Sequence, residues 1–220
     1  MQKLPRGRHT LDRAAVVASQ KERLCWAAFE VIARRGYRAA SVAAIIDRAG
    51  ISRRTFYELF TDKEACFQAA CDFFIDRMKT DLQQRSVGMP TLDWKDLVRS
   101  SLEIYLAGLA ENPTAAIALH VETLVAGREL AAQRAQVQEF LADRMRRAHH
   151  LAYAQDPSVR GTPDGVYDFL IGGIDDRIRH CLHTRGAEQL PSLLPLLHHS
   201  TLALLGVSAI ETGIQLGSNL

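Results

Sequence analysis

Residues 41–60 read SVAAIIDRAGISRRTFYELF, and this stretch decides the fold. Ser41 is a good N-cap, and the apolar residues that follow it recur at the spacing of an α-helix. Gly50 is suited to end that helix, because glycine readily adopts the left-handed conformation of a tight helix stop. Ser52 then caps a second, short helix. Two helices joined by a short glycine-containing turn are typical of a helix-turn-helix, whose second helix enters a DNA major groove.

The second helix of this pair has two chemically different faces. Its apolar residues fall mostly on one side, where they pack on neighbouring helices: Ile51, Phe56, Leu59 and Phe60. Its polar residues fall on the other side: Arg53, Arg54, Tyr57 and Glu58. Arginine and tyrosine on an exposed helix face are suited to contact phosphates and base edges. The alternative is a solvated face of a helical hairpin, and Glu58 can partly neutralise Arg54 four residues before it.

The chain from about Gln20 to about Asp72 resembles the TetR family of transcriptional regulators. The resemblance rests on a long, ordered pattern: Leu24, Ala28, Phe29, Ala33, Gly36, Tyr37, Ser41, Val42, Ile45, Ala49, Gly50, Ile51, Ser52, Thr55, Phe56, Tyr57, Phe60, Lys63 and Glu64. It implies a three-helix head whose third helix reads the major groove, with Tyr57 and Lys63 on DNA phosphates. One departure is Leu59, where the family often has histidine, so one polar DNA contact is lost.

The residues predicted to contact DNA lie in or beside the two short helices. They are Arg38, Ser41, Val42, Ser52, Arg53, Arg54, Thr55, Tyr57 and Lys63. The basic start of the chain is either an arm that reaches a minor groove or a tail that only aids solubility. Its basic residues include Lys3, Arg6, Arg8, His9 and Arg13.

Charge is distributed unevenly along the 220 residues, although the net charge is only +2. Residues 1–62 contain 12 Lys and Arg against 6 Asp and Glu, which gives +6. Residues 63–220 contain 15 against 19, which gives −4. A basic segment followed by a mildly acidic one predicts a DNA-binding domain over 1–62 and a regulatory and dimerisation domain over 63–220.

The rest of the chain has helical periodicity, so the predicted fold is all-α: a three-helix head and a helical-bundle body. A capping box at Ser19–Glu22 predicts the start of the first helix, and a second one at Thr61–Glu64 predicts the start of a long helix. The spacing predicts helices over about 19–35, 62–85, 93–110, 113–127, 129–153, 163–183 and 188–212.

The body is predicted to hold a small-molecule effector and to form a homodimer. Candidate effector contacts are aromatic or polar residues on apolar faces, each also readable as plain core: Phe74, Met78, Tyr105, His120, Met145, Tyr167 and Asp175. The last helix is apolar nearly all round, which favours burial between two copies. The predicted interface residues are Phe169, Gly173, Ile178, Leu193, Leu197 and Leu204.

Other classes of protein find little support in the sequence. It has no nucleotide-binding, nucleophile-elbow or zinc-protease motif, so we expect no enzyme, no cofactor and no metal site. The four cysteines lie among apolar residues, which favours core packing in a reducing cytoplasm over redox sensing by Cys66 or Cys71. Residues 189–210 carry no formal charge, but prolines and histidines interrupt them, so a buried helix is favoured over a membrane span.

Together these patterns predict a cytoplasmic, homodimeric repressor that binds a near-palindromic operator in duplex DNA and is released by a small-molecule ligand. The alternatives are a DNA-binding regulator that responds to a protein or redox signal, or that activates. A helical enzyme or scaffold that merely contains a similar hairpin is a further alternative.

Overall fold

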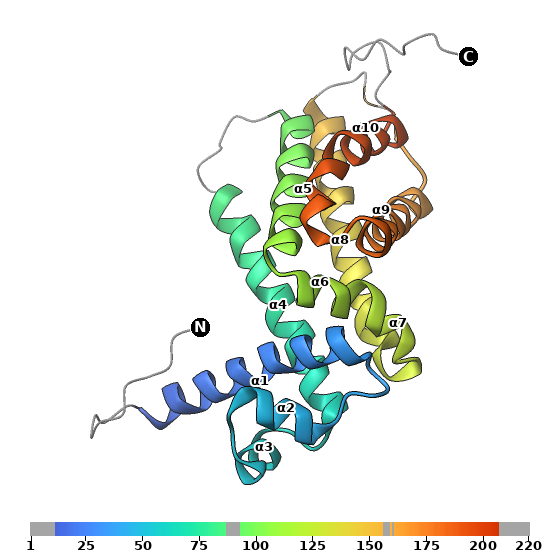
Figure 1. The fold of residues 1–220 in the computed structure, drawn as a ribbon. Helices are drawn as coiled ribbons and strands as arrows, with labels where there is room; N and C mark the ends of the chain where they lie inside the picture. Colours follow the sequence, from blue (N-terminus) through green and yellow to red (C-terminus); the bar gives the residue numbers. More distant parts are fainter. Residues whose placement is uncertain (1–11, 87–92, 156–158, 160, 207–220) are drawn as a thin grey trace. The chain divides into compact units, whose positions relative to one another are not determined.

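The computed structural model describes residues 12–86, 93–155, 159 and 161–206. Within these ranges the chain is helical and contains no strand, which confirms the all-α prediction (Figure 1). Its packing divides it into two units. Unit 1 contains the chain up to Arg77 together with Thr114–Gln133, and unit 2 contains Met78–Pro113 and the chain from Arg134 onward. The domain boundary proposed after residue 62 stays a prediction.

Unit 1 is built on the helices of the predicted head (Figure 1). They are α1 (Arg13–Arg35), α2 (Val42–Ala49), α3 (Arg53–Leu59) and the first part of α4 (Lys63–Ser86). The later segment of unit 1 contributes α6 (Pro113–Ile117), η1 (Ala118–Glu122), α7 (Thr123–Val125) and the start of α8 (Arg128–Gln155). The predicted basic arm lies outside the described residues, except for Arg13, which begins α1.

The start of the first helix was predicted wrongly. Helix α1 begins at Arg13, and the carboxylate of Asp12 accepts from the backbone N–H of Ala14 at its N-terminus. The capping-box residues Ser19 and Glu22 therefore lie inside the helix. The reason is that the helix-favouring run before Ser19 continues the helix once the Asp12 cap is available. In the second predicted capping box, Asp62 accepts from the N–H of Ala65 at 2.8 Å.

Aromatic rings form the core of unit 1. Phe29, Phe67 and Phe74 are fully or almost fully buried. The Phe29 ring meets those of Phe67 and Phe74 edge to face, with centroids 6.3 and 6.1 Å apart. Trp26 adds an edge-to-face contact with Phe29 at 5.9 Å. These contacts between α1 and α4 fix the platform on which the helix-turn-helix rests.

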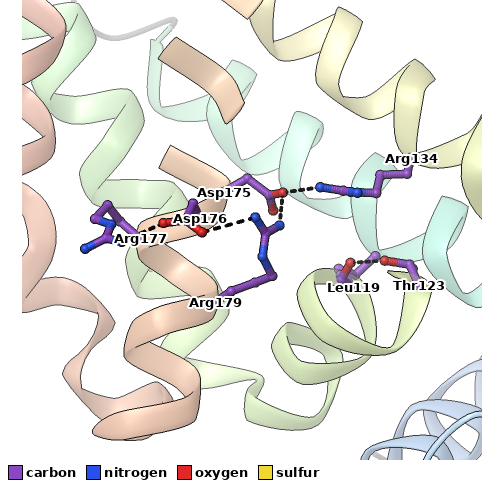
Figure 2. A network of polar contacts seen from close by, with 7 residues as sticks. All are labelled: Leu119, Thr123, Arg134, Asp175, Asp176, Arg177 and Arg179. Carbon is purple, nitrogen blue, oxygen red and sulfur yellow. Dashed lines mark hydrogen bonds and ion pairs between the residues drawn. The ribbon is translucent and has the colours of Figure 1, made fainter. Parts of the chain in front are cut away.

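The helix predicted over 113–127 is interrupted. Its middle is the π-helix η1, between the short helices α6 and α7. Inside this segment the hydroxyl of Thr123 donates to the carbonyl oxygen of Leu119 at 2.6 Å (Figure 2). Such side-chain bonds compete with the regular backbone ladder, which accounts for part of the irregularity. Gly127 then ends the segment with a positive φ of 81°, in line with the predicted break.

Unit 2 is a bundle of longer helices. Its elements include α5 (Trp94–Glu111), most of α8, α9 (Gly165–Thr184), η2 (Ala187–Leu193) and α10 (Leu194–Leu204). The 3₁₀-helix η2 packs on α5 and α9, and α10 packs on α5 and α9. Residues Trp94, Leu106, Tyr167, Ile178 and Leu197 are buried in this bundle.

The single last helix predicted over 188–212 is corrected. The described chain forms η2 first and begins the α-helix only at Leu194, with Pro195 in its first turn. Neither Pro191 nor Pro195 has an N–H to donate, so an α-helix that began at Glu188 would lack two of its backbone hydrogen bonds. The predicted end of the helix lies outside the described residues. Among the helices that are described, none is both long and apolar enough to cross a bilayer.

The cysteines are buried and free of disulfides: Cys25, Cys66, Cys71 and Cys181. Burial is the main cause that raises the pKa of Cys25 and of Cys66 to about 12, and it also raises the pKa of Cys71. Redox sensors need an accessible thiolate. A thiol that stays protonated inside a core does not supply one, so the redox alternative for Cys66 and Cys71 loses support.

The raised pKa values of Cys25, Cys66 and Cys71 predict a loss of stability at alkaline pH. Above pH 9 these thiols ionise in the unfolded chain but stay protonated in the folded one, so the unfolded state binds fewer protons. The free energy of unfolding therefore falls as pH rises from 9 towards 12, by up to about 1.4 kcal/mol per pH unit for each thiol. Urea unfolding at pH 8 and at pH 10 measures this, and Cys71→Ala should flatten the pH dependence by the share of one thiol. Equal pH dependence in wild type and Cys71→Ala contradicts the assignment.

Candidate nucleic-acid interface

Local backbone chemistry builds the helix-turn-helix. The hydroxyl oxygen of Ser41 accepts from the N–H of Ala44 at 3.2 Å and caps α2. Gly50 ends that helix in the left-handed conformation, at φ 61° and ψ 42°. The hydroxyl oxygen of Ser52 accepts from the N–H of Thr55 at 3.1 Å and caps α3. All three devices were predicted from the sequence, and together they fix the angle between the two helices.

Two arginines that were not among the predicted site residues, Arg23 and Arg48, fix the end of α2 and its contact with α1. The guanidinium of Arg23, on α1, donates to the carbonyl oxygens of Ala49 and Gly50 at the end of α2. A positive group there satisfies carbonyls that have no partner within the helix. Arg48 forms an ion pair with Glu30, which links α2 to α1. Both contacts join residues far apart in sequence, so no local spacing indicates them.

Helix α3 presents a basic and aromatic outer face. The side chain of Arg54 is 89% exposed, and Arg53 is also exposed. Tyr57 is 50% exposed, and the Arg53 guanidinium lies 6.0 Å from the centre of its ring. On the opposite face Phe56 is fully buried and Phe60 is nearly so. The predicted division of the helix into a packing face and an outer face is thus what the structure has.

Lys63 has a structural contact in addition to its predicted role. Its ammonium donates to the carbonyl oxygen of Tyr37 at 2.7 Å and lies 4.3 Å from the centre of the Tyr37 ring. The lysine is partly buried at the first position of α4. Since an ammonium has three donors, two remain for a phosphate. The contact with Tyr37 therefore orients Lys63 and leaves its ammonium able to donate to a phosphate.

The predicted DNA-contacting residues come together in unit 1. Most are exposed, and Val42, Thr55 and Lys63 are partly exposed. The exposed members are Arg38, Ser41, Ser52, Arg53, Arg54 and Tyr57. Their surfaces are available to a ligand, and their contact with DNA stays a prediction.

The pair formed by Arg54 and Glu58 gives a test of this face. Arg54 Nε donates to Glu58 Oε1 at 2.9 Å, and both side chains are exposed. Such an ion pair contributes only about 0–1 kcal/mol to stability. Glu58→Gln should leave stability unchanged and raise the affinity for duplex DNA about three- to tenfold at low salt, because Arg54 is freed and a negative charge is removed. Fluorescence anisotropy with a labelled duplex measures this.

The control for Glu58 is Glu103, an exposed carboxylate in unit 2. Glu103→Gln changes the net charge equally but should change DNA affinity little. Equal effects of both substitutions would show that only net charge matters and that α3 is not the contact face.

The predicted effector residues fall in both units. Phe74 belongs to the aromatic core of unit 1, and His120 is buried in η1. The others lie in unit 2: Met78, Tyr105, Met145, Tyr167 and Asp175. The Tyr167 hydroxyl lies 2.8 Å from His149 Nδ1 in a buried hydrogen bond. A shared effector site for these seven residues stays a prediction.

Asp175 is the centre of a polar network in unit 2 (Figure 2). Its carboxylate accepts from Arg134 on α8, at 2.6 Å, and from Arg179 on its own helix. Burial, and then the nearby charge of Asp175, raises the pKa of Tyr105. Asp175 and Tyr105 were predicted site residues, whereas the two arginines were not, because Arg134 reaches Asp175 across 41 residues.

The predicted dimer residues separate into two groups. Ile178, Leu193 and Leu197 are buried within their own chain, so the core of unit 2 uses them. Their role in a dimer stays a prediction, because an apolar pattern does not distinguish an internal face from an external one. Phe169 is 71% exposed and Leu204 is 38% exposed, and Gly173 is exposed as well.

Residues 26–70 match the family described as bacterial regulatory proteins, tetR family. An uncharacterized HTH-type transcriptional regulator of Bacillus subtilis, YerO, is 31% identical over 75 residues. That match covers 32% of this chain but only 26% of YerO, so the chain matches about a quarter of that relative's length.

Two solved structures share the fold over most of the chain. One is the fatty acid degradation regulator FadR from Bacillus halodurans, with a TM-score of 0.69 at 20% identity, covering 83% of this chain and 94% of that one. The other is the transcriptional regulator FadR from Bacillus subtilis, in complex with stearoyl-CoA. Its TM-score is 0.69 at 20% identity, and the match covers 84% of this chain and 98% of that one.

Proposed function

We propose that this chain, as a member of the tetR family of bacterial regulatory proteins, is a transcription regulator. In this proposal it is homodimeric and cytoplasmic. It binds a near-palindromic operator in duplex DNA as a repressor, and a small molecule releases it. The observation that carries the proposal is the outer face of α3. Arg53, Arg54 and Tyr57 are exposed there, while Phe56 anchors the helix through its buried face.

The chemistry of this face supports two kinds of DNA contact. Arg54 and Lys63 suit phosphates, which supply sequence-independent affinity that falls with salt. Arg53 follows the Ser52 cap at the first position of α3, and an arginine at this end of a recognition helix suits the O6 and N7 acceptors of guanine. We therefore assign affinity chiefly to the first two residues and base preference chiefly to Arg53.

The outer face of α9 supports the homodimer. Phe169 is a large exposed apolar side chain, and Gly172 and Gly173 follow it one turn later. A methyl group added at either glycine would have no described atom within 4 Å. Glycine in a helix interior costs about 0.5–1 kcal/mol relative to alanine. Nothing described in the chain itself requires glycine here, whereas close approach of a second α9 does.

Release by a small molecule rests on the buried polar groups of unit 2. The ion pairs of Asp175 and the hydrogen bond between His149 and Tyr167 place polar groups inside a mostly apolar bundle, as ligand sites do. The FadR of Bacillus subtilis was solved with stearoyl-CoA, an acyl thioester. Acyl-CoA esters of several chain lengths are therefore the first compounds to test on this chain.

Selection of bound duplexes from genomic DNA, followed by titration at several salt concentrations, tests the function. We expect one enriched near-palindrome, and an affinity that falls about 10³- to 10⁵-fold between 50 and 200 mM salt if six to ten phosphates are contacted. Affinity that ignores salt, with no enriched sequence, would contradict DNA binding. Compounds that raise the melting temperature are then titrated into the complex. If they bind but leave operator affinity unchanged, the released-repressor mechanism is wrong while DNA binding stands.

A further inference from the structure

The turn between α1 and α2 is held by a residue far away in the sequence. The backbone N–H of Tyr37 donates to Glu122 Oε2 at 2.7 Å, across 85 residues. Glu122 is the last residue of the π-helix η1, which belongs to unit 1. A π-helical turn departs from the regular bond pattern and is frequent at functional sites. This one brings a carboxylate to a backbone donor in the DNA-binding head.

Tyr37 is held from its other side by Lys63. Its carbonyl oxygen accepts from the Lys63 ammonium at 2.7 Å, and its ring lies under the same ammonium. The residue is therefore fixed between a carboxylate and an ammonium, each through a charge-assisted hydrogen bond, the stronger class of such bonds. The Tyr37 ring also packs on Phe67, with centroids 5.5 Å apart, which limits its movement.

The backbone on either side of Tyr37 gives the Glu122 bond its importance. Gly36 closes α1 with φ 77° and ψ 154°, and Ala40 donates back to its carbonyl oxygen at 3.1 Å. An ideal side-chain carbon at Gly36 would lie 3.7 Å from the Glu122 carboxylate, so the acid rests directly against this turn. Ser41, which caps α2, follows at once. The position of Tyr37 therefore determines where the Lys63 ammonium lies and where the chain enters α2.

We propose that Glu122 is a positioning residue for DNA binding, which acts through the Tyr37 backbone to hold Lys63 in place for a phosphate. The inference rests on the proposed function. It also makes η1 the segment through which the later part of unit 1 sets the affinity of the head.

The sign of the effect separates this role from general electrostatics. Removing a negative charge from a DNA-binding protein ordinarily strengthens its binding to DNA. Glu122→Ala should instead weaken binding to the selected operator about tenfold and lower the salt slope by about one unit, the same result that we expect of Lys63→Ala. Glu122→Gln keeps an acceptor for the Tyr37 N–H and should recover most of the affinity. Glu103→Ala, with the same change of charge, should bind at least as tightly as wild type.

A double-mutant cycle tests the connection between the two residues. If Glu122 acts through Lys63, the double variant should bind no more weakly than Lys63→Ala alone, because the second substitution removes nothing further. Additive losses would overturn the proposal. So would a Glu122→Ala protein with a lower melting temperature but unchanged affinity and salt slope, since that is a merely structural role.

The control on the whole scheme is the wild type. Absence of salt-dependent DNA binding by wild type overturns the proposed function and this inference together. Binding by wild type that Glu122→Ala and Glu122→Gln both match overturns the inference alone. If Glu122→Ala fails to fold, Glu122→Asp decides the question, because it keeps the charge but withdraws the carboxylate from the Tyr37 N–H by one methylene group. It should weaken operator binding and lower the salt slope, and wild-type binding by this variant overturns the inference.

Discussion

Phe169→Asp will leave the protein helical but monomeric, and will weaken operator binding about 10²- to 10⁴-fold. Phe169 is exposed within its own chain, so the substitution removes little internal packing. In an isologous dimer the twofold axis places two copies of each interface residue, and hence two new charges, in one desolvated region. Two unlinked heads then lose the effective concentration that joins the half-sites. Light scattering measures the mass, and circular dichroism measures the helix content.

Two further substitutions sharpen this test. Leu197 is 3% exposed, so Leu197→Asp places an unpaired charge in the core of unit 2 and should unfold the protein rather than split it. Gly173→Ala should weaken the dimer while raising the stability of the monomer by about 0.5–1 kcal/mol, because alanine favours the helix. A Phe169→Asp protein that remains dimeric at micromolar concentration would place the interface elsewhere.

Phe56→Ala will destabilise the DNA-binding head by about 3–5 kcal/mol, the usual cost of truncating a fully buried phenylalanine. Its ring packs 5.8 Å from that of Phe60, so both helix-turn-helix packing and the end of α3 lose support. Since domains are stable by only about 5–15 kcal/mol, operator binding should be lost at moderate temperature. Thermal unfolding and DNA titration on the same preparation measure both effects.

The neighbouring tyrosine is the matched control for Phe56. Tyr57 is half exposed, so Tyr57→Ala should change the free energy of unfolding by no more than about 0.5–1 kcal/mol. It should still weaken DNA binding about tenfold if its ring lies on the DNA backbone. A Tyr57→Ala protein as unstable as Phe56→Ala would show that the outer face of α3 is part of the packing.

Short-range chemistry made the helix-turn-helix predictable. Ser41, Gly50 and Ser52 act on bonds within five residues of themselves, so their roles can be derived from spacing alone. The same local rule failed at Ser19, because a capping box competes with continuation of the helix. The helix begins at Arg13, with Asp12 as its cap, and runs through Ser19. It also failed in the last helix, where Pro191 and Pro195 delayed the α-helical pattern.

What could not be predicted depends on contacts between distant parts of the chain. Arg23 reaches the end of α2 across 26 residues, and Glu122 reaches Tyr37 across 85. Such pairs cannot be predicted from the spacing of polar residues along a helix, because that spacing is the same whether a side chain contacts solvent or a distant backbone group. Burial has the same limit: Leu197 and Phe169 are both apolar residues on amphipathic helices, yet one is internal and the other exposed.

The head of this protein is discontinuous in the chain, and this governs how it can be cut. A fragment that ends at Arg77 contains the whole helix-turn-helix but lacks Thr114–Gln133, the rest of its packing unit. In that fragment the Tyr37 N–H loses the Glu122 carboxylate, and the face of α1 that packs on η1 opens to water. A chimaera that grafts this head onto another body must therefore carry both segments. Transplanting residues 1–77 alone moves α3 without Glu122, the residue that holds the backbone of Tyr37 ahead of the helix-turn-helix.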